Sequence, residues 1–431
     1  VFRQKIRGTP ANIDYPYWEE DSHFDLDFHL RHLGLPKPGD WRQFCIQISR
    51  LHSRPLDLTR PLWELYVIEG LDNFEGCPPN SFALYFKVHH AAMDEFTAQE
   101  LMQSLHLHSP DYRHHGRAQQ KVAYLEAKAP TNTQMIALGM VNNTLRSARL
   151  AVQLVTNWST LGRVAAGLAI RMTRRAIDGE SVTGTPTTRF AAPLTQSRVF
   201  EGGFYPRSLL ESYAAEVRGA TVGHAVLAIC GEAMRSYLAS FGEASDEPLQ
   251  AMLAVNVRNA GAHALIGNHI AVSQVPLHTD LDFPIQRLQA ICATHPELSN
   301  VEADELTSFR LRSLYENLPA PLLAWLGRTA NRENSVHRGV LSAGNCGVSE
   351  MIGSDKPLYL LGARLIGFTG IQPLFSGCGL MFTSSTYCDQ IGLTFVSDKT
   401  KLPDPLVMRR CVDEAVAQVE RYLRDSKNKT A

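Results

Sequence analysis

The sequence lacks the features typical of membrane-spanning and nucleic-acid-binding proteins. Its longest uncharged, apolar-leaning run in the central region extends from Leu150 to Gly162, and polar residues such as Gln153 and Asn157 interrupt it. This run is shorter than the roughly 18 residues that a membrane-spanning helix needs. Basic and acidic residues number 42 and 43, so no overall positive field exists for a nucleic-acid partner. We therefore expect neither a transmembrane helix nor nucleic-acid binding.

Closely spaced cysteines and the common catalytic signatures are also absent. The eight cysteines lie far apart and no C-x-x-C pair occurs, which argues against a zinc ribbon or a thioredoxin-like pair. The chain contains no G-x-S-x-G elbow, no Walker phosphate loop and no G-x-G-x-x-G after a strand. Hydrolases, kinases and dinucleotide-binding enzymes of the ordinary kind are thereby excluded. We expect free thiols in a reducing, cytoplasmic environment, and neither a metal site nor a resident cofactor.

Length and hydrophobic pattern indicate an α/β protein of two or three domains. At about 150 residues per domain, 431 residues with 44% hydrophobic content allow this number. We place an N-terminal domain at 1–110, a crossover with basic helices at 111–190 and a C-terminal domain at 191–431. We expect strands over Ser81–His89, Met252–Val257, Ile270–Leu277 and Ile391–Val396, and helices over Glu95–Leu105, Thr221–Leu238 with Thr221 as N-cap, and Pro405–Leu423.

The segment from His89 to Asp94, HHAAMD, carries the strongest chemical signal. An imidazole with an ordinary pKa near 6.5 accepts a proton from a hydroxyl or an amine at neutral pH. Because neighbouring side chains of a strand point to opposite faces, we expect only one of His89 and His90 to face a given cavity. Asp94, at the start of the following helix, either fixes a ring tautomer, binds a distant arginine, or acts as a helix N-cap. Spacing alone leaves a catalytic and a structural role open.

A long central segment without acidic residues is the most unusual part of the chain. Ala127–Ile177 contains no Asp or Glu, and apolar residues at helical spacing alternate with its arginines. A basic amphipathic helix of this kind can lie on an anionic lipid surface, and it can equally connect two domains with a solvated basic face. Both interpretations stay open. The basic residues are Lys128, Arg146, Arg149, Arg163, Arg171, Arg174 and Arg175.

Several segments occur in an order that is typical of one enzyme family. HHAAMDE, from His89 to Glu95, is similar to an H-H-x-x-x-D-G motif, and RPLWELYVIEGL, from Arg60 to Leu71, to a P-L-W segment followed by I-E-G. With these segments the chain resembles the bacterial wax ester synthase/diacylglycerol acyltransferases, and the resemblance covers nearly its whole length. Further similar segments are DLDFHLRHLGLPKPG (25–39), VNVR (255–258), GN (267–268), PLHTDLDFPIQRL (276–288), PLYLLGARL (357–365) and the closing GLTFVSD.

The resemblance implies a fold and an activity. The fold is that of chloramphenicol acetyltransferase and of peptide-synthetase condensation domains, the two-domain coenzyme A-dependent acyltransferase fold. It is α/β, with mixed sheets, flanking helices and an active-site tunnel between the domains. The activity is transfer of a fatty acyl group from acyl-coenzyme A to a long-chain alcohol or a diacylglycerol, with no other cofactor. The protein would be cytoplasmic, peripherally bound to the inner membrane face or to lipid inclusions.

The same resemblance implies roles for particular residues. His90 is expected to be the general base, His89 to support the turn and Asp94 to be structural. A thioester is already activated, so no serine or cysteine nucleophile is needed. The basic central segment is expected to offer an entrance for coenzyme A phosphates or to rest on lipid. Further expectations are Arg258 as the partner of Asp94, Pro61, Leu62 and Trp63 as walls of the acyl or alcohol pocket, and Asn268 as a substrate-binding residue.

Three departures from the family pattern define the alternatives. Glu95 replaces the glycine that closes the motif, Gly223-His224 replaces Asn-Asp, and Asn345–Met351 (NCGVSEM) replaces a segment close to S-N-V-P-G-P. Because glycine allows close backbone approach, we expect the Glu95 side chain to crowd the channel. The alternatives are a catalytically weak acyl- or lipid-binding protein and an acyltransferase with another acceptor. Since the chain begins at Val1, we expect the opening strand and helix of the first domain to precede it.

Overall fold

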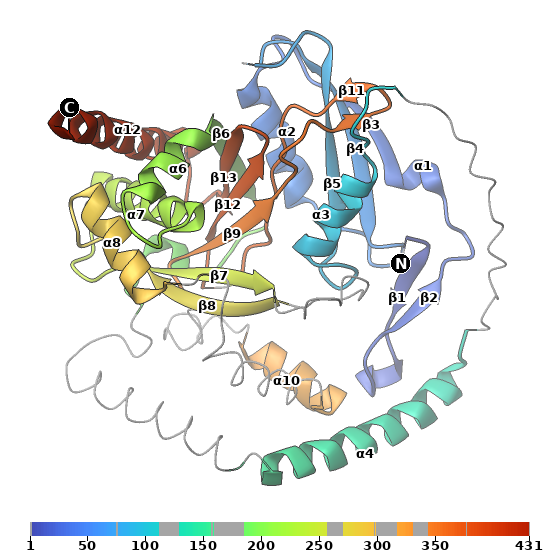
Figure 1. The fold of residues 1–431 in the computed structure, drawn as a ribbon. Coiled ribbons are helices and arrows are strands. Elements are labelled where there is room, and N and C mark those ends of the chain that lie inside the picture. The colour runs from blue at the N-terminus through green and yellow to red at the C-terminus, as the bar shows by residue number, and fades with distance from the viewer. Residues whose placement is uncertain are drawn as a thin grey trace.

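The computed structural model describes most of the chain and shows two mixed sheets with flanking helices (Figure 1). A six-stranded sheet and a three-stranded sheet are accompanied by two pairs of short strands. This arrangement confirms the predicted α/β class with mixed sheets. The described residues are 2–74, 76–111, 129–156, 158, 185–256, 270–296, 298, 317–330, 344–375 and 377–430.

The larger sheet is built from the second half of the chain, in the order β6-β13-β12-β9-β7-β8. Its pairs β9–β12 and β7–β9 are parallel, and β6–β13, β12–β13 and β7–β8 are antiparallel. Helices lie beside it in Figure 1. The strands are β6 (Arg198–Pro206), β7 (Gln250–Asn256), β8 (Ile270–Pro276), β9 (Cys346–Ile352), β12 (Leu380–Tyr387) and β13 (Gln390–Asp398), and the helices are α6 (Arg207–Ala215), α7 (Val222–Ser240), α8 (Pro284–Thr294) and α12 (Pro405–Thr430).

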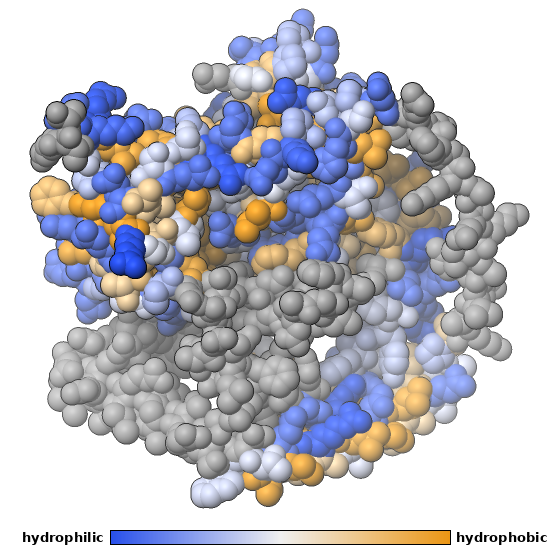
Figure 2. Space-filling model, viewed as in Figure 1, coloured by the Kyte–Doolittle hydropathy of each residue, from blue (hydrophilic) through white to orange (hydrophobic). Residues whose placement is uncertain are grey.

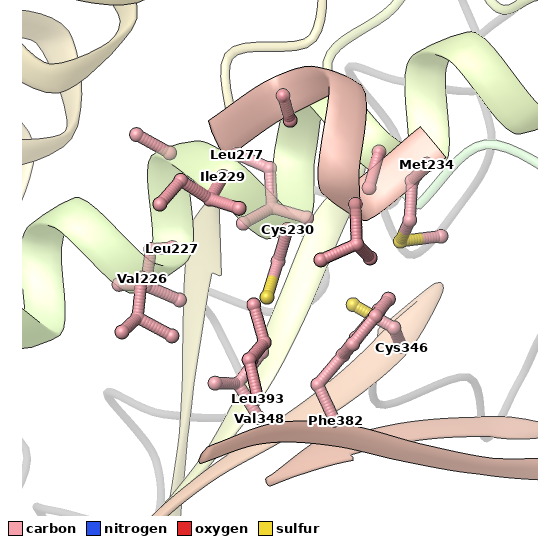
Figure 3. Close-up of a cluster of buried hydrophobic side chains, with 14 of the residues drawn as sticks. Val226, Leu227, Ile229, Cys230, Met234, Leu277, Cys346, Val348, Phe382 and Leu393 are labelled. Atoms are coloured by element: carbon pink, nitrogen blue, oxygen red, sulfur yellow. The ribbon is translucent and has the colours of Figure 1, made fainter. Parts of the chain in front are cut away.

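Helix α7 forms the centre of the main hydrophobic core. An α-helix that is apolar on nearly all sides is stable only when it is buried, and α7 is buried along most of its length. Figure 3 shows its side chains beside those of the large sheet. The labelled residues are Val226, Leu227, Ile229, Cys230 and Met234 of α7, together with Leu277, Cys346, Val348, Phe382 and Leu393.

The smaller sheet belongs to the first half of the chain and is connected to the larger one through a helix. Strand β4 (Trp63–Leu71) pairs in parallel with β3 (Leu30–Gly34) and antiparallel with β5 (Ser81–Val88), and α2 (Trp41–Ser53) packs against this sheet. On α2, Ser49 Oγ accepts from the backbone N–H of Phe200 and Ser53 Oγ from that of Arg198, each at 2.8 Å. The two serine hydroxyls thus accept from backbone N–H groups on the outer edge of β6. At the edge of an open sheet such groups have no neighbouring strand to pair with.

The remaining elements surround these two sheets. Helix α4 packs on the turn around η1, where Arg146 forms an ion pair with the buried Asp14. Helix α3 directly follows β5. The bounds are β1 (Gln4–Arg7), η1 (Pro10–Asn12), β2 (Tyr17–Glu20), α1 (Leu26–His29), α3 (Glu95–Ser104), α4 (Asn132–Thr156), η2 (Arg189–Ala191), α10 (Ala320–Ala330), β10 (Tyr359–Leu360) and β11 (Ala363–Arg364).

The predicted local elements are present, with ends shifted by a few residues. Strands β5, β7, β8 and β13 and helices α3, α7 and α12 confirm the seven expected segments, and α4 forms part of the expected central helical region. All eight cysteines fall within the described ranges and are free, as predicted. None of the described helices combines the length and hydropathy that crossing a membrane requires. The division at residues 110 and 190 stays a prediction.

Candidate active site

The two histidines lie in the turn between β5 and α3. Strand β5 ends at Val88, and the turn is closed by bonds from Ala92 N to His89 O at 2.8 Å and from His89 N to Leu62 O at 3.0 Å. His89 Nδ1 accepts from Ala91 N at 3.0 Å, so the neutral ring carries its proton on Nε2. Burial and the neighbouring His90 lower the pKa of His89. His89 thus braces the turn and stays neutral at neutral pH.

Asp94 provides the N-cap of α3. It has extended backbone angles, φ −86° and ψ 177°, and its side chain accepts from Thr97 N at 2.9 Å. This satisfies one of the backbone N–H groups that a helix start leaves without a partner. The carboxyl is 1% exposed. The N-cap interpretation is confirmed, and the predicted partner Arg258 lies outside the described residues.

Glu95 is the first residue of α3 and joins the turn to the second half of the chain. Its Oε2 accepts from Ser349 Oγ at 2.6 Å and from Gln372 Nε2, and Gln372 also donates to Ser349 Oγ at 3.3 Å. Burial raises the pKa of this carboxyl, although both hydrogen bonds act in the other direction. Only 8% of Glu95 is exposed. The expected crowding is therefore not found, because the side chain is enclosed in the wall.

A cavity of about 2200 Å³ lies in front of the histidine turn. Pockets for one drug-sized ligand measure roughly 300–1,000 Å³, so this volume accommodates two large substrates together. Its lining comes from both halves of the chain and is mostly apolar, which suits acyl chains. Apolar lining residues include Phe44, Ile48, Leu84, Phe86, Met93 and Met102 from the first half and Phe204, Met252, Met351, Leu374 and Met381 from the second.

Both His89 and His90 line this cavity. The expectation that only one of the two rings faces a given cavity stays a prediction. The alternation of faces on which it rests applies within a strand, and both residues lie beyond the end of β5, where the chain turns. His90 is partly buried and His89 is exposed. The turn therefore places both residues beside one cavity.

The segment Pro61-Leu62-Trp63 supports the turn and does not belong to the described lining, contrary to expectation. All three residues are buried. Trp63 stacks on His29 with ring centroids 4.6 Å apart and donates from Nε1 to Phe2 O at 2.9 Å. The carbonyl of Leu62 receives the bond from His89 N. The segment packs behind the turn, and its bond to His89 N holds His89 in place.

A third histidine in the lining, His52, is held in a neutral state. Its Nδ1 lies 3.0 Å from the hydroxyl oxygen of Tyr85. Burial, followed by the positive charges of Lys87 and Arg198, lowers the pKa of His52 to about 4. Lys87 in turn donates to the carbonyls of Leu51 (2.9 Å) and Arg54, at the C-terminal end of α2. This cation thus stabilises the end of a helix dipole.

Other expected residues lie away from the cavity or outside the described part. Gly223 and His224 are not among the described lining residues, nor is α4. In the described part of the basic segment, Arg146 is paired with Asp14, and the role of this segment as an entrance stays a prediction. Asn268 and the arginines at 163, 171, 174 and 175 lie outside the described residues. Among the residues described, no cluster of three His, Cys, Asp or Glu side chains could hold a metal ion.

Sequence reasoning did not identify Ser349 and Gln372 as site residues. Ser349 lies in the segment that departs from the family pattern, which was its only signal. Gln372 lies in the stretch between β11 and β12, without a local motif. Both are buried and line the cavity. Contacts across 254 and 277 positions of the chain brought them to Glu95.

Comparisons with known proteins agree with this geometry. The family model "Wax ester synthase/diacylglycerol acyltransferase catalytic domain" matches residues 1–215, and the C-terminal domain model of the same family matches residues 266–420. The chain is 26% identical to "O-acyltransferase WSD" of Acinetobacter baylyi over 409 residues, covering 93% of this chain and 81% of that protein.

Solved structures show the same fold. The wax ester synthase/diacylglycerol acyltransferase from Marinobacter aquaeolei VT8 aligns with a TM-score of 0.63 at 24% identity, covering 98% of this chain and 86% of that one. The first condensation domain of the calcium-dependent antibiotic synthetase aligns with a TM-score of 0.50 at 15% identity, covering 97% and 84%. The predicted two-domain acyltransferase fold is confirmed. Together with the two family models, which match most of its length, these findings establish that the chain is an O-acyltransferase that belongs to the wax ester synthase/diacylglycerol acyltransferase family.

Proposed function

We propose that the protein transfers a fatty acyl group from acyl-coenzyme A to the hydroxyl of a long-chain alcohol or a diacylglycerol, with His90 as the general base. The observation that carries the proposal is the position of His90 in the wall of a cavity large enough for both substrates. The mostly apolar lining suits two acyl or alkyl chains, and holding both substrates together supplies much of the rate enhancement.

The reaction needs one base and a good leaving group. The His90 imidazole takes the proton of the acceptor hydroxyl while its oxygen attacks the thioester carbonyl carbon. The carbon–sulfur bond then breaks, and the imidazolium returns the proton to the sulfur of coenzyme A. His89 is the poorer candidate, because its Nδ1 is occupied by Ala91 N and its pKa is lowered.

A direct assay tests this assignment. The purified chain is supplied with hexadecanoyl-coenzyme A and either hexadecanol or a dipalmitoylglycerol, and coenzyme A release and the ester mass are measured. His90→Ala is expected to lower kcat by roughly 10²–10⁴-fold, as the loss of a positioned base does. The matched control is His32→Ala on β3, an exposed histidine paired with Glu69 at 3.1 Å, which should leave the rate unchanged. Full turnover in His90→Ala would refute the assigned base, and acyl-ligand binding without ester formation would favour a lipid-binding protein.

We further propose that α4 attaches the protein to a lipid surface. One side of α4 packs on the η1 turn through Met135, Gly139 and Arg146. The other side carries an exposed apolar stripe at helical spacing, along the lower edge of the view in Figure 2. An exposed apolar stripe on a helix without acidic residues suits an anionic bilayer. The stripe consists of Leu138, Val141, Leu145, Val152 and Val155, all between 48% and 72% exposed.

Vesicle flotation tests the lipid surface. Binding to vesicles that contain anionic phosphatidylglycerol is expected to fall several-fold in Val152→Asp, because a charge replaces an apolar group at the lipid boundary. Ser147→Asp places the same charge on an exposed position of α4 outside the stripe and should have a smaller effect. Equal flotation of the two variants would leave the stripe without a role.

A further inference from the structure

Among the described residues, only one of the two carboxyl oxygens of Glu95 has hydrogen-bond partners. Its Oε2 accepts from both Ser349 and Gln372, whereas its Oε1 is buried without a hydrogen-bond partner in the described part of the chain. A buried acceptor left without a bond costs roughly 1–3 kcal/mol. A residue that served only to join the two halves would be expected to have both oxygens bonded or compensated by a neighbouring positive charge. The second oxygen therefore indicates a partner that arrives from elsewhere.

A comparison with Glu201 shows what a purely internal carboxyl looks like. Glu201 is also buried, and its Oε2 likewise lacks a hydrogen-bond partner among the described residues. It is, however, compensated by charge, since the guanidinium groups of Arg42 and Arg409 each approach it to 4.0 Å. It also lies outside the described cavity lining. Glu95 has no ion pair with any described cation, and it does line the cavity.

The position of Glu95 restricts what the missing partner is. Glu95 is the first residue of α3, His90 lies in the turn just before this helix, and both line the same cavity. Because Ser349 and Gln372 hold Oε2, Oε1 is the oxygen of Glu95 that is left to accept from a donor in the cavity. Burial raises the pKa of Glu95, and a hydroxyl group suits both the neutral and the ionised carboxyl because it donates and accepts.

We propose that Glu95 is a specificity-determining residue that binds a second hydroxyl of the acceptor, next to the one that reacts. This inference rests on the proposed acyl transfer and narrows its acceptor to alcohols with a second free hydroxyl, which a diacylglycerol lacks. The preferred acceptor is a long-chain molecule with two neighbouring hydroxyls, such as a 1,2-diol or a monoacylglycerol. A simple alcohol of the same length leaves Oε1 buried and unbonded, so it is the poorer substrate.

Competition between two acceptors of equal length tests the proposal. With 1,2-hexadecanediol and 1-hexadecanol in one reaction, we expect about a tenfold preference for the diol, the ratio that one well-made hydrogen bond supports. In Glu95→Gly the ratio is expected to fall close to one, and Glu95→Gln, which keeps a polar group of the same shape, should restore part of it. An unchanged ratio in Glu95→Gly would overturn the proposal.

Two controls separate acceptor selection from support of the fold. Ser349→Ala removes a bond to Oε2 and leaves Oε1 in place, so the diol preference should persist even if the protein is less stable. Glu100→Gln changes an exposed glutamate on the same helix and should alter nothing. Loss of the preference in Ser349→Ala to the same degree as in Glu95→Gly would indicate a structural role only.

A binding measurement keeps this test independent of turnover. Displacement of a fluorescent fatty acid from the cavity by the diol and by the alcohol is compared in wild type and Glu95→Gly. If no ester forms from either acceptor, the proposed transfer fails, while tighter diol binding that depends on Glu95 still supports selection. Equal displacement by both ligands in both proteins would refute the role of Glu95.

Discussion

Two helix starts in this protein carry a histidine next to a polar cap and use it differently. At α7 the ring of His224 is fully buried, its Nδ1 accepts from Thr221 N at 3.0 Å and its Nε2 donates to His295 O at 2.7 Å. At α3 Asp94 supplies the cap, and His90 precedes it in the cavity wall. A histidine beside a capped helix start is therefore not by itself evidence of an active site. What distinguishes His90 is the cavity in front of it.

The largest expected difference between the two starts is in stability. His224→Ala should lower the free energy of unfolding by about 3–5 kcal/mol, because it leaves a void in place of a fully buried ring and removes the bonds to Thr221 N and His295 O. His90→Ala should lower it by less than about 1 kcal/mol, since the ring is only partly buried. Urea unfolding followed by circular dichroism measures both. Equal destabilisation would mean that the His90 ring is as structural as that of His224.

His52 sharpens the comparison, because it lines the cavity and is nevertheless structural. Its folded pKa of about 4 lies below the ordinary 6.5, so below pH 6.5 the unfolded chain binds a proton that the folded chain does not. Stability should therefore fall as the pH drops from about 6.5 towards 4, by up to about 3 kcal/mol from this group. Unfolding at pH 7, 6 and 5 should show a shallower loss in His52→Gln, with the exposed His32→Gln as control. The same pH slope in all three proteins would contradict this assignment.

The smallest expected effects concern the caps themselves. Asp94→Ala should cost about 1 kcal/mol of stability, and Asp94→Asn less, because asparagine also caps helices well. Thr221→Ala should cost less than Asp94→Ala, since the His224 ring still accepts from the backbone N–H of residue 221. Thermal unfolding of the three variants gives the order. A loss in Asp94→Asn as large as in Asp94→Ala would show that the charge of Asp94, and not its cap, is what matters.

Local patterns predicted the elements well because helix spacing, strand composition and caps depend on neighbours in the chain. The strand before His89, the helix after Asp94 and the Asp94 cap follow from such patterns. The same patterns extended this strand to His89, whereas its pairing with β4 ends at Val88, so both histidines lie in the turn. The role of Trp63 was also missed, since its stacking partner His29 lies 34 positions earlier.

Ordered motifs and local periodicity were enough to identify the family, the fold class and the turn that carries His90. The side chains that surround this turn follow from long-range packing instead. Ser349 and Gln372 meet Glu95 because two sheets from distant parts of the chain pack around one cavity. Burial then governs the charge state of Glu95 and leaves one of its oxygens without a partner. Desolvation is a property of the packed molecule, and no local pattern of residues encodes it.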